Sequence, residues 1–417
     1  MTDCYAWFLG IDWGYETHQV CLIDATGHIR HTRRVDHDRA AIEAFISDVS
    51  QETGGAPAAI AVAIESPRGA LVATLLERGF AVFAINPKQL DRFRDRHTAA
   101  GAKDDRRDAH VLADSLRTDR SAFRGVPPED AVVVQLRALA HGEADCARDL
   151  SRLTNQLRDQ VYRIAPQLLR LCPAADEPWF WTLLDVAPTP DEQQRLTRTQ
   201  VLTVLRTHRI RRLTAPDVLA AVRTPSFGLA PGVVEATRDA LQMLIAHLRF
   251  VAAQRTQCEA RQEHLLAALR QRPASEAEPG EHRNVEILAS LPGVGRMTTV
   301  AMLTEATQPL ATRDYDGLRT HMGVAPITKA SGKRRLVHMR LACNPRLREA
   351  AYHWARVSVQ QDPSTATYYR RLRARGQTHG RTLRSVVDRW LRILVAMLAH
   401  RTLYDSTRFQ TAVAVPV

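Results

Sequence analysis

Clustered cysteines, membrane-length apolar runs and a leader-like N-terminus are all missing from this 417-residue sequence. The six cysteines, at positions 4, 21, 146, 172, 258 and 343, show no CxxC spacing, which argues against a disulfide scaffold and a structural zinc site. The apolar run at residues 393–399 is far shorter than the roughly 20 residues of a membrane span. No basic stretch followed by a long apolar segment begins the chain. We therefore expect a cytoplasmic protein with no membrane partner.

Positive charge is concentrated in one segment. The chain has 57 Lys and Arg against 45 Asp and Glu, and residues 331–392, with 15 basic and 3 acidic residues, hold the whole excess of 12. This concentration predicts a polyanionic partner, and nucleic acid is favoured because no amphipathic lipid anchor accompanies the basic segment. Only four of the basic residues are lysine, so genomic base composition is an alternative source of the arginine enrichment.

The first 125 residues alternate between strand-like and helix-like patterns. Strand-like segments lie at 5–11, 18–24, 29–35, 58–64 and 81–85, and helix-like segments at 39–49, 69–78 and 104–116. The first three strands form a predicted antiparallel meander, and the last two are predicted to be buried central strands. Three antiparallel strands followed by strand–helix units is the order of an RNase H-like sheet. We therefore predict a mixed α/β domain over residues 1–125.

The rest of the chain is predicted to be mostly helical. Leucine spacings of three and four predict one long helix over 136–171, kinked at Pro166, and another over 234–269. These helices form an expected helical or coiled-coil arm over 126–282, either paired with each other or meeting another subunit. The basic cluster 208–212 between them fits a solvated helix face as well as a nucleic-acid contact. A polar linker at 271–283 precedes a mostly helical domain over 283–410, and residues 411–417 are expected to form a loose tail.

Four carboxylates are candidates for one metal site. Asp12 and Glu65 each follow a predicted strand, and Asp105 and Asp108 share one face of a predicted helix. Carboxylates gathered at one sheet edge repel one another unless cations neutralise them, and Mg²⁺ or Mn²⁺ prefers such ligands. We expect two ions, which would clamp the attacking and leaving oxygens of a phosphodiester. The alternative is that Asp12 and Glu65 are turn or cap residues and that the helical pair lies on an exposed face.

Two glycine-containing segments of the C-terminal part carry further candidates. The sequence Leu-Pro-Gly-Val-Gly at 291–295 resembles a helix-hairpin-helix turn, in which Gly293 and Gly295 let backbone amides approach a phosphate. An ordinary turn between packed helices is the alternative. Ser331 lies in a predicted loop beside a glycine and three cations, which are Lys333, Arg334 and Arg335. A hydroxyl attacks phosphorus only when it is positioned and activated, so composition alone makes Ser331 a loop or capping residue.

These motifs, in this order, resemble the DEDD insertion-sequence transposases, a family also described as bridge-RNA-guided recombinases. The matching segments are Gly-Ile-Asp-Trp-Gly at 10–14, Ile-Glu-Ser at 64–66, Asn-Pro at 86–87, Lys-Asp-Asp-Arg-Arg-Asp-Ala at 103–109, and the segments 291–295, 323–333 and 344–348. The resemblance runs nearly from end to end. It implies a RuvC-like domain, a helical arm and a C-terminal transposase domain.

The resemblance also implies roles for individual residues. Asp12, Glu65, Asp105 and Asp108 correspond to the metal-binding tetrad, and Ser331 corresponds to the nucleophile of the C-terminal domain. The chain departs from the family pattern at Asp104, where Thr or Ser is frequent, so either Asp104 or Asp105 supplies the ligand. A second departure is the single glycine after Ser331, where relatives often have two. The expected nucleic-acid-binding residues are Gly293, Gly295, Lys333, Arg334, Arg335, Arg346 and Arg348.

The function implied by the resemblance is that of a DNA transposase or recombinase that moves its own element by strand exchange. Its expected partners are the element's DNA ends, the target DNA and a structured guide (bridge) RNA, and its expected assembly is a homodimer or homotetramer. Two other classes stay open. One is a metal-dependent Holliday-junction resolvase or nuclease, and the other is a non-catalytic RNA- or DNA-binding remnant. A covalent protein–DNA adduct separates the first two, because only serine catalysis leaves one.

Overall fold

The computed structural model describes residues 5–54, 56–67, 69–97, 104–225, 230, 232–271, 281–331 and 334–406. The chain divides into two compact units, Met1–Asp130 and Ala131–Val417. None of the helices within the described ranges is long and apolar enough to cross a membrane.

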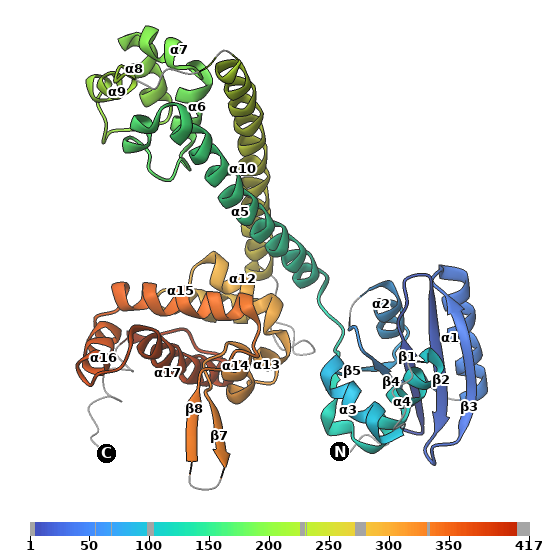
Figure 1. Ribbon diagram of the computed structural model, residues 1–417. Helices are drawn as coiled ribbons and strands as arrows, with labels where there is room; N and C mark the ends of the chain where they lie inside the picture. The colour runs from blue at the N-terminus through green and yellow to red at the C-terminus, as the bar shows by residue number, and fades with distance from the viewer. Residues whose placement is uncertain are drawn as a thin grey trace. The chain divides into compact units, whose positions relative to one another are not determined.

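The first unit is built on a six-stranded mixed sheet (Figure 1). Its strands are β1 (Trp7–Asp12), β2 (Thr17–Asp24), β3 (Ile29–Asp36), β4 (Ile60–Ile64), β5 (Ala81–Ala84) and β6 (Arg124–Gly125), in the spatial order β3-β2-β1-β4-β5-β6. β1, β4 and β5 run parallel, whereas β2, β3 and β6 pair antiparallel with their neighbours. This confirms the predicted mixed α/β domain and is consistent with an RNase H-like fold.

Helices cover both faces of this sheet. They are α1 (Arg39–Thr53), α2 (Ala70–Glu77), α3 (Pro87–His97) and α4 (Asp105–Thr118), with short 3₁₀ helices at Pro57–Ala59 and Arg120–Ala122. Side chains alternate along each strand, so Leu9 of β1 packs in one core with α1 and α2, and Phe8 packs in another core with α3 and α4. The central strand β4 is buried at all five positions, as its apolar sequence predicts.

Helix α3 is absent from the sequence prediction, which placed only one helix after β5. Its sequence is strongly polar, and among its side chains that the structure describes only Leu90 is buried in the core with Phe93 partly buried beside it, so the apolar periodicity is weak. The capping signal is nevertheless present. Pro87 occupies the first helical position, and the side chain of Asn86 accepts a hydrogen bond from the amide of Lys88 at 3.0 Å.

The second unit contains two long helices, α5 (Ala131–Ile164) and α10 (Val233–Gln271), that pack side by side (Figure 1). Gln262 of α10 donates a hydrogen bond to Glu143 of α5 at 2.9 Å, whereas Leu157 of α5 shares a core with Leu241 of α10. The two helices therefore run antiparallel. The predicted kink is wrong, because α5 ends at Ile164 and Pro166, which has no N–H, begins a separate 3₁₀ helix (Pro166–Arg170).

The remaining helices form two separate cores with the ends of this pair. One end packs with α6 (Pro178–Val186), α7 (Pro190–Arg195), α8 (Arg198–Thr207) and α9 (Ala215–Val222). The other end packs with α11 (Glu281–Ser290), α12 (Arg296–Glu305), α13 (Thr307–Ala311), α14 (Tyr315–His321), α15 (Pro345–Gln361), α16 (Pro363–Ala374) and α17 (His379–His400). The base of the helix pair is thus part of the C-terminal core. Most of the predicted linker and the predicted tail lie outside the described residues, but residues 281–283 begin α11.

A β-hairpin replaces the predicted serine loop. It consists of the antiparallel strands β7 (Ile327–Ser331) and β8 (Arg334–His338), and it projects from the C-terminal helices (Figure 1). The loop prediction gave weight to the glycine and cations, and missed the β-branched and apolar residues on either side of them. Ile327, Thr328, Leu336 and Val337 favour two short strands.

Candidate active site

Asp12 and Glu65 emerge at the same end of the sheet. Asp12 is the last residue of β1, and Glu65 directly follows β4. These strands are parallel and Ile11 pairs with Ile64, so the two carboxylates occupy corresponding positions just beyond that pair. Neighbouring strands lie about 4.8 Å apart, which brings the two backbones close enough for both carboxylates to serve one site. Each side chain is partly buried.

Helix α4, which carries Asp105 and Asp108, begins towards this end of the sheet. The helix packs against β1 so closely that a Cβ atom on Gly10 would lie 1.9 Å from the carbonyl oxygen of Ala109. At the other end of α4, Arg117 lies 3.5 Å from the carbonyl oxygen of Ala25, next to the point where β2 ends and β1 begins. The first turn of α4 therefore lies towards the end of β1 that carries Asp12.

Asp104 and Asp105 have different surroundings at the start of α4. Asp104 is the N-cap, and its carboxylate accepts a hydrogen bond from the amide of Arg106 at 3.1 Å. Asp105 lies in the first turn with an exposed side chain. Because the cap already uses the Asp104 carboxylate, the geometry favours Asp105 as the ligand. Lys103 of the same motif lies outside the described residues.

Asp108 is held by an arginine that the sequence analysis missed. Both Asp108 oxygens accept hydrogen bonds from Arg94 of α3, at 2.8 and 2.9 Å, and Asp108 is only 4% exposed. Burial lowers the pKa of Arg94, but the hydrogen bonds and charge of Asp108 outweigh it, so the net shift is upward. The charge of Asp108 is thus balanced by a fork-like guanidinium contact. Arg94 was overlooked because helix α3 was not predicted. The Asn86-Pro87 helix-capping sequence could have revealed this helix.

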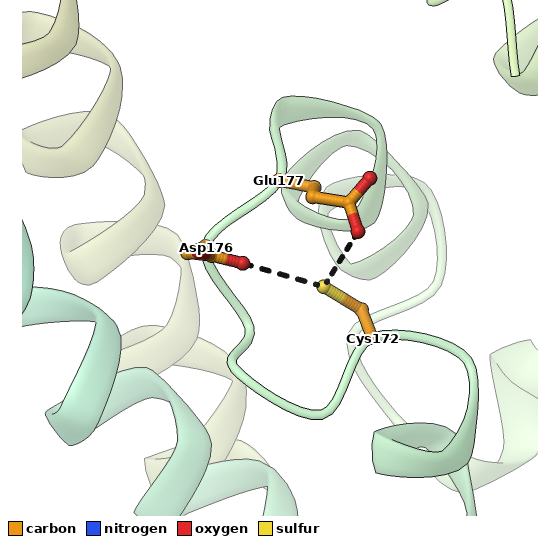
Figure 2. Close-up of side chains that lie close together, drawn as sticks. All are labelled: Cys172, Asp176 and Glu177. Atoms are coloured by element: carbon orange, nitrogen blue, oxygen red, sulfur yellow. Dashed lines mark hydrogen bonds between the residues drawn. The ribbon is translucent and has the colours of Figure 1, made fainter. Parts of the chain in front are cut away.

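The four carboxylates do not close into a tight cluster in this structure. Among the described residues, the group of three ligand side chains whose atoms all lie within 4.8 Å of one another is Cys172, Asp176 and Glu177 (Figure 2). No three of the predicted tetrad meet that spacing. The fold therefore gathers their positions at one sheet end, while Asp108 faces Arg94.

The group in Figure 2 is accounted for by contacts within the protein. The Cys172 sulfur lies 4.0 Å from Asp176 and 3.7 Å from Glu177, and burial raises the pKa of the Cys172 thiol, so the thiol donates to these carboxylates. Glu177 also accepts from the Trp179 indole at 2.9 Å and pairs with Arg212 at 2.5 Å. One arginine of the basic cluster 208–212 is therefore used inside the second unit.

A histidine pair, of which His18 is buried and His37 is exposed, lies beside the loop that follows Asp12. His18 is fully buried, and its Nε2 lies 2.8 Å from Nδ1 of His37. Its Nδ1 lies 3.4 Å from the amide nitrogen of Gly14, and its ring lies against Trp13. Burial lowers the pKa of His18, and the charge of His37 lowers it further, so the neutral ring is favoured. The pair fixes the loop that leaves β1.

The glycine turn before α12 packs against α15. Gly293 has φ of +80°, and a Cβ atom there would lie 2.5 Å from the backbone nitrogen of Ser358. The Gly293 amide donates to the side chain of Gln361 at 3.0 Å, so this amide already has a partner. Close helix packing accounts for the glycine. The assignment of Gly293 and Gly295 to nucleic-acid contact stays a prediction.

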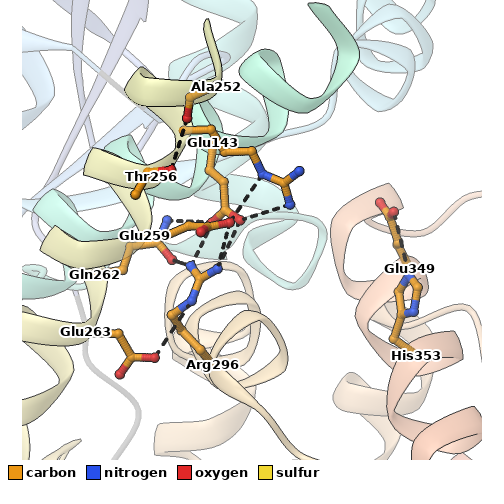
Figure 3. A network of polar contacts seen from close by, with 10 residues as sticks. Glu143, Ala252, Thr256, Glu259, Gln262, Glu263, Arg296, Glu349 and His353 are labelled. Atoms are coloured by element: carbon orange, nitrogen blue, oxygen red, sulfur yellow. Dashed lines mark hydrogen bonds and ion pairs between the residues drawn. The ribbon is translucent and has the colours of Figure 1, made fainter. Parts of the chain in front are cut away.

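Acidic side chains surround the start of α12. Arg296 forms ion pairs with Glu143 of α5 at 2.8 Å and with Glu259 of α10 at 3.4 Å (Figure 3). These contacts are within the second unit and tie α12 to both long helices. The arginine is only 19% exposed at its side chain, which makes this network a buried connection between the helix pair and the C-terminal core.

Ser331 ends β7 and pairs directly with Arg334 at the start of β8. Both side chains are exposed, and so is Arg335, which pairs with Ala330. Gly332 and Lys333 between the strands lie outside the described residues. The base of the hairpin is held by a hydrogen bond of 3.2 Å from Arg340 to the carbonyl oxygen of Ala325.

The first turn of α15 follows the hairpin and carries the two other predicted nucleic-acid-binding arginines. Asn344 caps this helix by accepting hydrogen bonds from the amides of Arg346 and Leu347, at 2.9 and 3.2 Å. Arg346 is partly buried, and its charge helps to lower the pKa of Glu305. Arg348 is exposed. Their contact with nucleic acid stays a prediction.

Comparison with known proteins adds independent information. A DEDD-type family model described as Transposase, for IS110 elements, matches residues 9–166, and a model described as Transposase IS116/IS110/IS902 family matches residues 285–370. The protein y4uE of Sinorhizobium fredii, named as a transposase, is 44% identical over 220 residues, which cover 52% of this chain and 60% of that protein.

Two relatives match over nearly the whole chain. The protein named as the mini-circle transposase for IS117 of Streptomyces coelicolor is 32% identical over 414 residues, covering 97% of each chain. An uncharacterised 43.6 kDa protein of insertion element IS110 from the same organism is 26% identical, covering 96% of this chain and 95% of the relative. The first family model covers most of β1 and everything from there to the end of α5, and the second covers α12 to α15 with the serine hairpin between them. The chain belongs to the IS116/IS110/IS902 family of transposases.

Proposed function

We propose that this protein catalyses RNA-guided DNA strand exchange for its own insertion sequence, by metal-assisted phosphoryl transfer with Ser331 as nucleophile. The metal part is supported by one observation: β1 and β4, which lead to Asp12 and Glu65, end side by side, and the first turn of α4 lies towards the same end of the sheet. The serine part is supported by the exposed position of Ser331 at the end of β7, next to a basic strand. Family membership supports both.

The donor set fits divalent cations. Asp12, Glu65, Asp105 and Asp108 offer only carboxylate oxygens, which suit Mg²⁺ or Mn²⁺, and two such ions would balance their charge. Asp108 already has a cationic partner in Arg94, which shows that its position favours a positive neighbour. Release of Arg94 would free both Asp108 oxygens for an ion. Ions held by these residues would polarise phosphate oxygens and stabilise the charge that develops during phosphoryl transfer.

Ser331 supplies a nucleophile that conserves the bond energy of the DNA backbone. Its oxygen forms a bond to phosphorus while the bond from phosphorus to a deoxyribose oxygen breaks. The hydroxyl proton passes to water, and the departing oxygen takes a proton from water. One phosphoester bond replaces another, so the strand can be rejoined to a new partner without an external energy source. Neighbouring cations stabilise the charge that develops on the phosphorus oxygens.

The partners follow from charge and architecture. The excess positive charge of residues 331–392 suits DNA ends, target DNA and a structured guide RNA. The paired helices α5 and α10 serve in this proposal as a coiled-coil arm that meets another subunit of a homodimer or homotetramer. Exposed apolar side chains on α10, Met243 at 74% and Phe250 at 62%, offer contact surface for such an assembly. The protein acts in the cytoplasm, where the element DNA is found.

The metal site is tested by substitutions at the start of α4. Asp105→Asn and Glu65→Gln should abolish strand exchange in Mg²⁺ while leaving the helical content unchanged. Asp104→Asn is the matched control, because asparagine caps a helix as well as aspartate does. It should retain activity. Full activity in both Asp105→Asn and Glu65→Gln would contradict the metal-site proposal, and loss of activity in Asp104→Asn alone would transfer the ligand role to Asp104.

A further inference from the structure

The strand register of the hairpin separates its cations into two sets. Residues directly opposite each other in an antiparallel pair share a face, and side chains alternate between faces along each strand. One face, which we call the serine face, therefore carries Ile327, Lys329, Ser331, Arg334, Leu336 and His338. The opposite face carries Thr328, Ala330, Arg335 and Val337. Lys329 and Arg334 thus share the side of Ser331, and Arg335 does not.

The distances across the serine face suit a single phosphate. Arg334 is the direct partner of Ser331, and Lys329 lies two residues before it on the same strand. Lys329 and Arg334 are diagonal neighbours, a relation that separates positions by about 7 to 8 Å. Both side chains are long enough to converge over the serine hydroxyl from these positions. Both are exposed, and neither has a carboxylate partner within the described part of the chain.

The hairpin also lacks the packing that would make it stable alone. Leu336 and Val337 are 54% and 62% exposed, one on each face, and every residue of the two described strands except Ile327 is exposed. An isolated two-stranded hairpin is marginally stable in water. We therefore expect a bound ligand to stabilise the hairpin. Because the serine face is positively charged, that ligand should be a polyanion.

We propose that Lys329 binds the scissile phosphate together with Arg334, and that Arg335, although next in sequence to Arg334, does not. This inference rests on the proposed role of Ser331 and deepens it by naming the group that holds the reacting phosphate. An ammonium group placed against a non-bridging oxygen stabilises the charge that grows during attack. Arg335, on the other face, remains free to contact the DNA backbone away from the reaction.

The first test compares three variants of the full chain on a DNA duplex that carries one of the element's own ends, with its guide RNA. Lys329→Ala should slow formation of the covalent adduct about 10² to 10³-fold, the usual cost of losing one such group. Lys329→Arg should restore most of the rate. Arg335→Ala removes the same charge from the opposite face, so it should weaken DNA binding but slow adduct formation at saturating DNA much less than Lys329→Ala does. Equal losses in Lys329→Ala and Arg335→Ala, or no loss in either, would overturn the inference.

The second test does not depend on serine chemistry. The chain has only four lysines, Lys88, Lys103, Lys329 and Lys333, so acetylation of each can be followed by mass spectrometry. The same duplex should protect Lys329 from acetylation in wild type and also in Ser331→Ala. Equal acetylation of Lys329 with and without DNA would overturn the inference even if Ser331 is the nucleophile. An adduct that persists in Ser331→Ala would instead overturn the proposal that Ser331 is the nucleophile. In that case the protection of Lys329 would still test whether Lys329 binds the DNA phosphate.

Discussion

Gly10→Ala should separate the catalytic helix from the sheet. An added Cβ atom would lie 1.9 Å from the carbonyl oxygen of Ala109 and 2.7 Å from the backbone nitrogen of Ala113. An ordinary contact needs at least 3.4 Å, so α4 must move by about 1.5 Å relative to β1. The obstacle is backbone on a buried helix, so no side-chain rotation can relieve it.

The expected cost follows from this overlap. Overpacking a core typically costs about 1 to 3 kcal/mol, and contact with a rigid backbone places Gly10→Ala near the upper end. For a unit of this size, a loss of about 3 kcal/mol lowers the melting temperature by roughly 10 °C. Because α4 also carries Asp105 and Asp108, strand exchange should fall about 10²-fold or more, as misplacement by 1 Å commonly costs.

The assay is hydrogen exchange of the peptide 105–118 in the full chain, followed beside the melting curve. Gly125→Ala is the matched control in the same sheet, because a Cβ atom there would meet only the Phe83 ring, at an ordinary 3.8 Å. Exchange in α4 should accelerate in Gly10→Ala and stay unchanged in Gly125→Ala. Equal melting temperatures for Gly10→Ala and wild type, with full activity, would refute the packing argument.

Three further predictions concern charge. Arg94→Met leaves the Asp108 carboxylate buried without its cation, so the first unit should lose about 3 kcal/mol of stability. Mg²⁺ should then raise the melting temperature of this variant more than that of wild type. An equal response to Mg²⁺ would contradict the link between Arg94 and the ion. Nucleic-acid affinity should fall by about 10³ to 10⁵ between 50 and 200 mM salt if about six to ten phosphates are contacted, and a salt-independent affinity in filter binding would be inconsistent with a role for the basic segment. Burial raises the pKa of Glu305, but hydrogen bonds from His141 and Asn344 outweigh burial and leave the pKa below its ordinary value of 4.5. The ionised Glu305 therefore stabilises the fold fully above pH 4.5, and this stabilisation is lost as the pH falls through the folded-state pKa. His141→Ala should flatten the acid side of a stability–pH curve measured by circular dichroism, and an unchanged acid side would refute the assignment.

The sequence predicted the sheet well because its strands are strongly patterned. The continuous apolar run of β4 and the meander of β1 to β3 have few alternative structures. The ends of those strands then placed Asp12 and Glu65 together without knowledge of any contact. Helix α3 was missed because its apolar residues Leu90 and Phe93 give little periodicity, and with it the partner of Asp108 was missed.

The C-terminal candidates depended on tertiary contacts that spacing does not reveal. A Pro-Gly turn looks the same in sequence whether it approaches a phosphate or a helix, and only the structure shows Gly293 against Ser358 of α15. The same holds for the serine segment. Its glycine and cations suggested a loop, whereas the strand register, which divides Lys329 and Arg334 from Arg335, requires knowledge of the pairing.

The most direct test of the account is to locate the covalent protein–DNA bond. Wild-type protein, its guide RNA and a labelled duplex carrying an element end are mixed in Mg²⁺, denatured, digested and analysed by mass spectrometry for a nucleotide-linked peptide. The account predicts a phosphoester on Ser331 that is absent in Ser331→Ala and in Asp105→Asn. Strand exchange at the wild-type rate by Ser331→Ala, or a nucleotide attached to another residue such as Thr328, would contradict it.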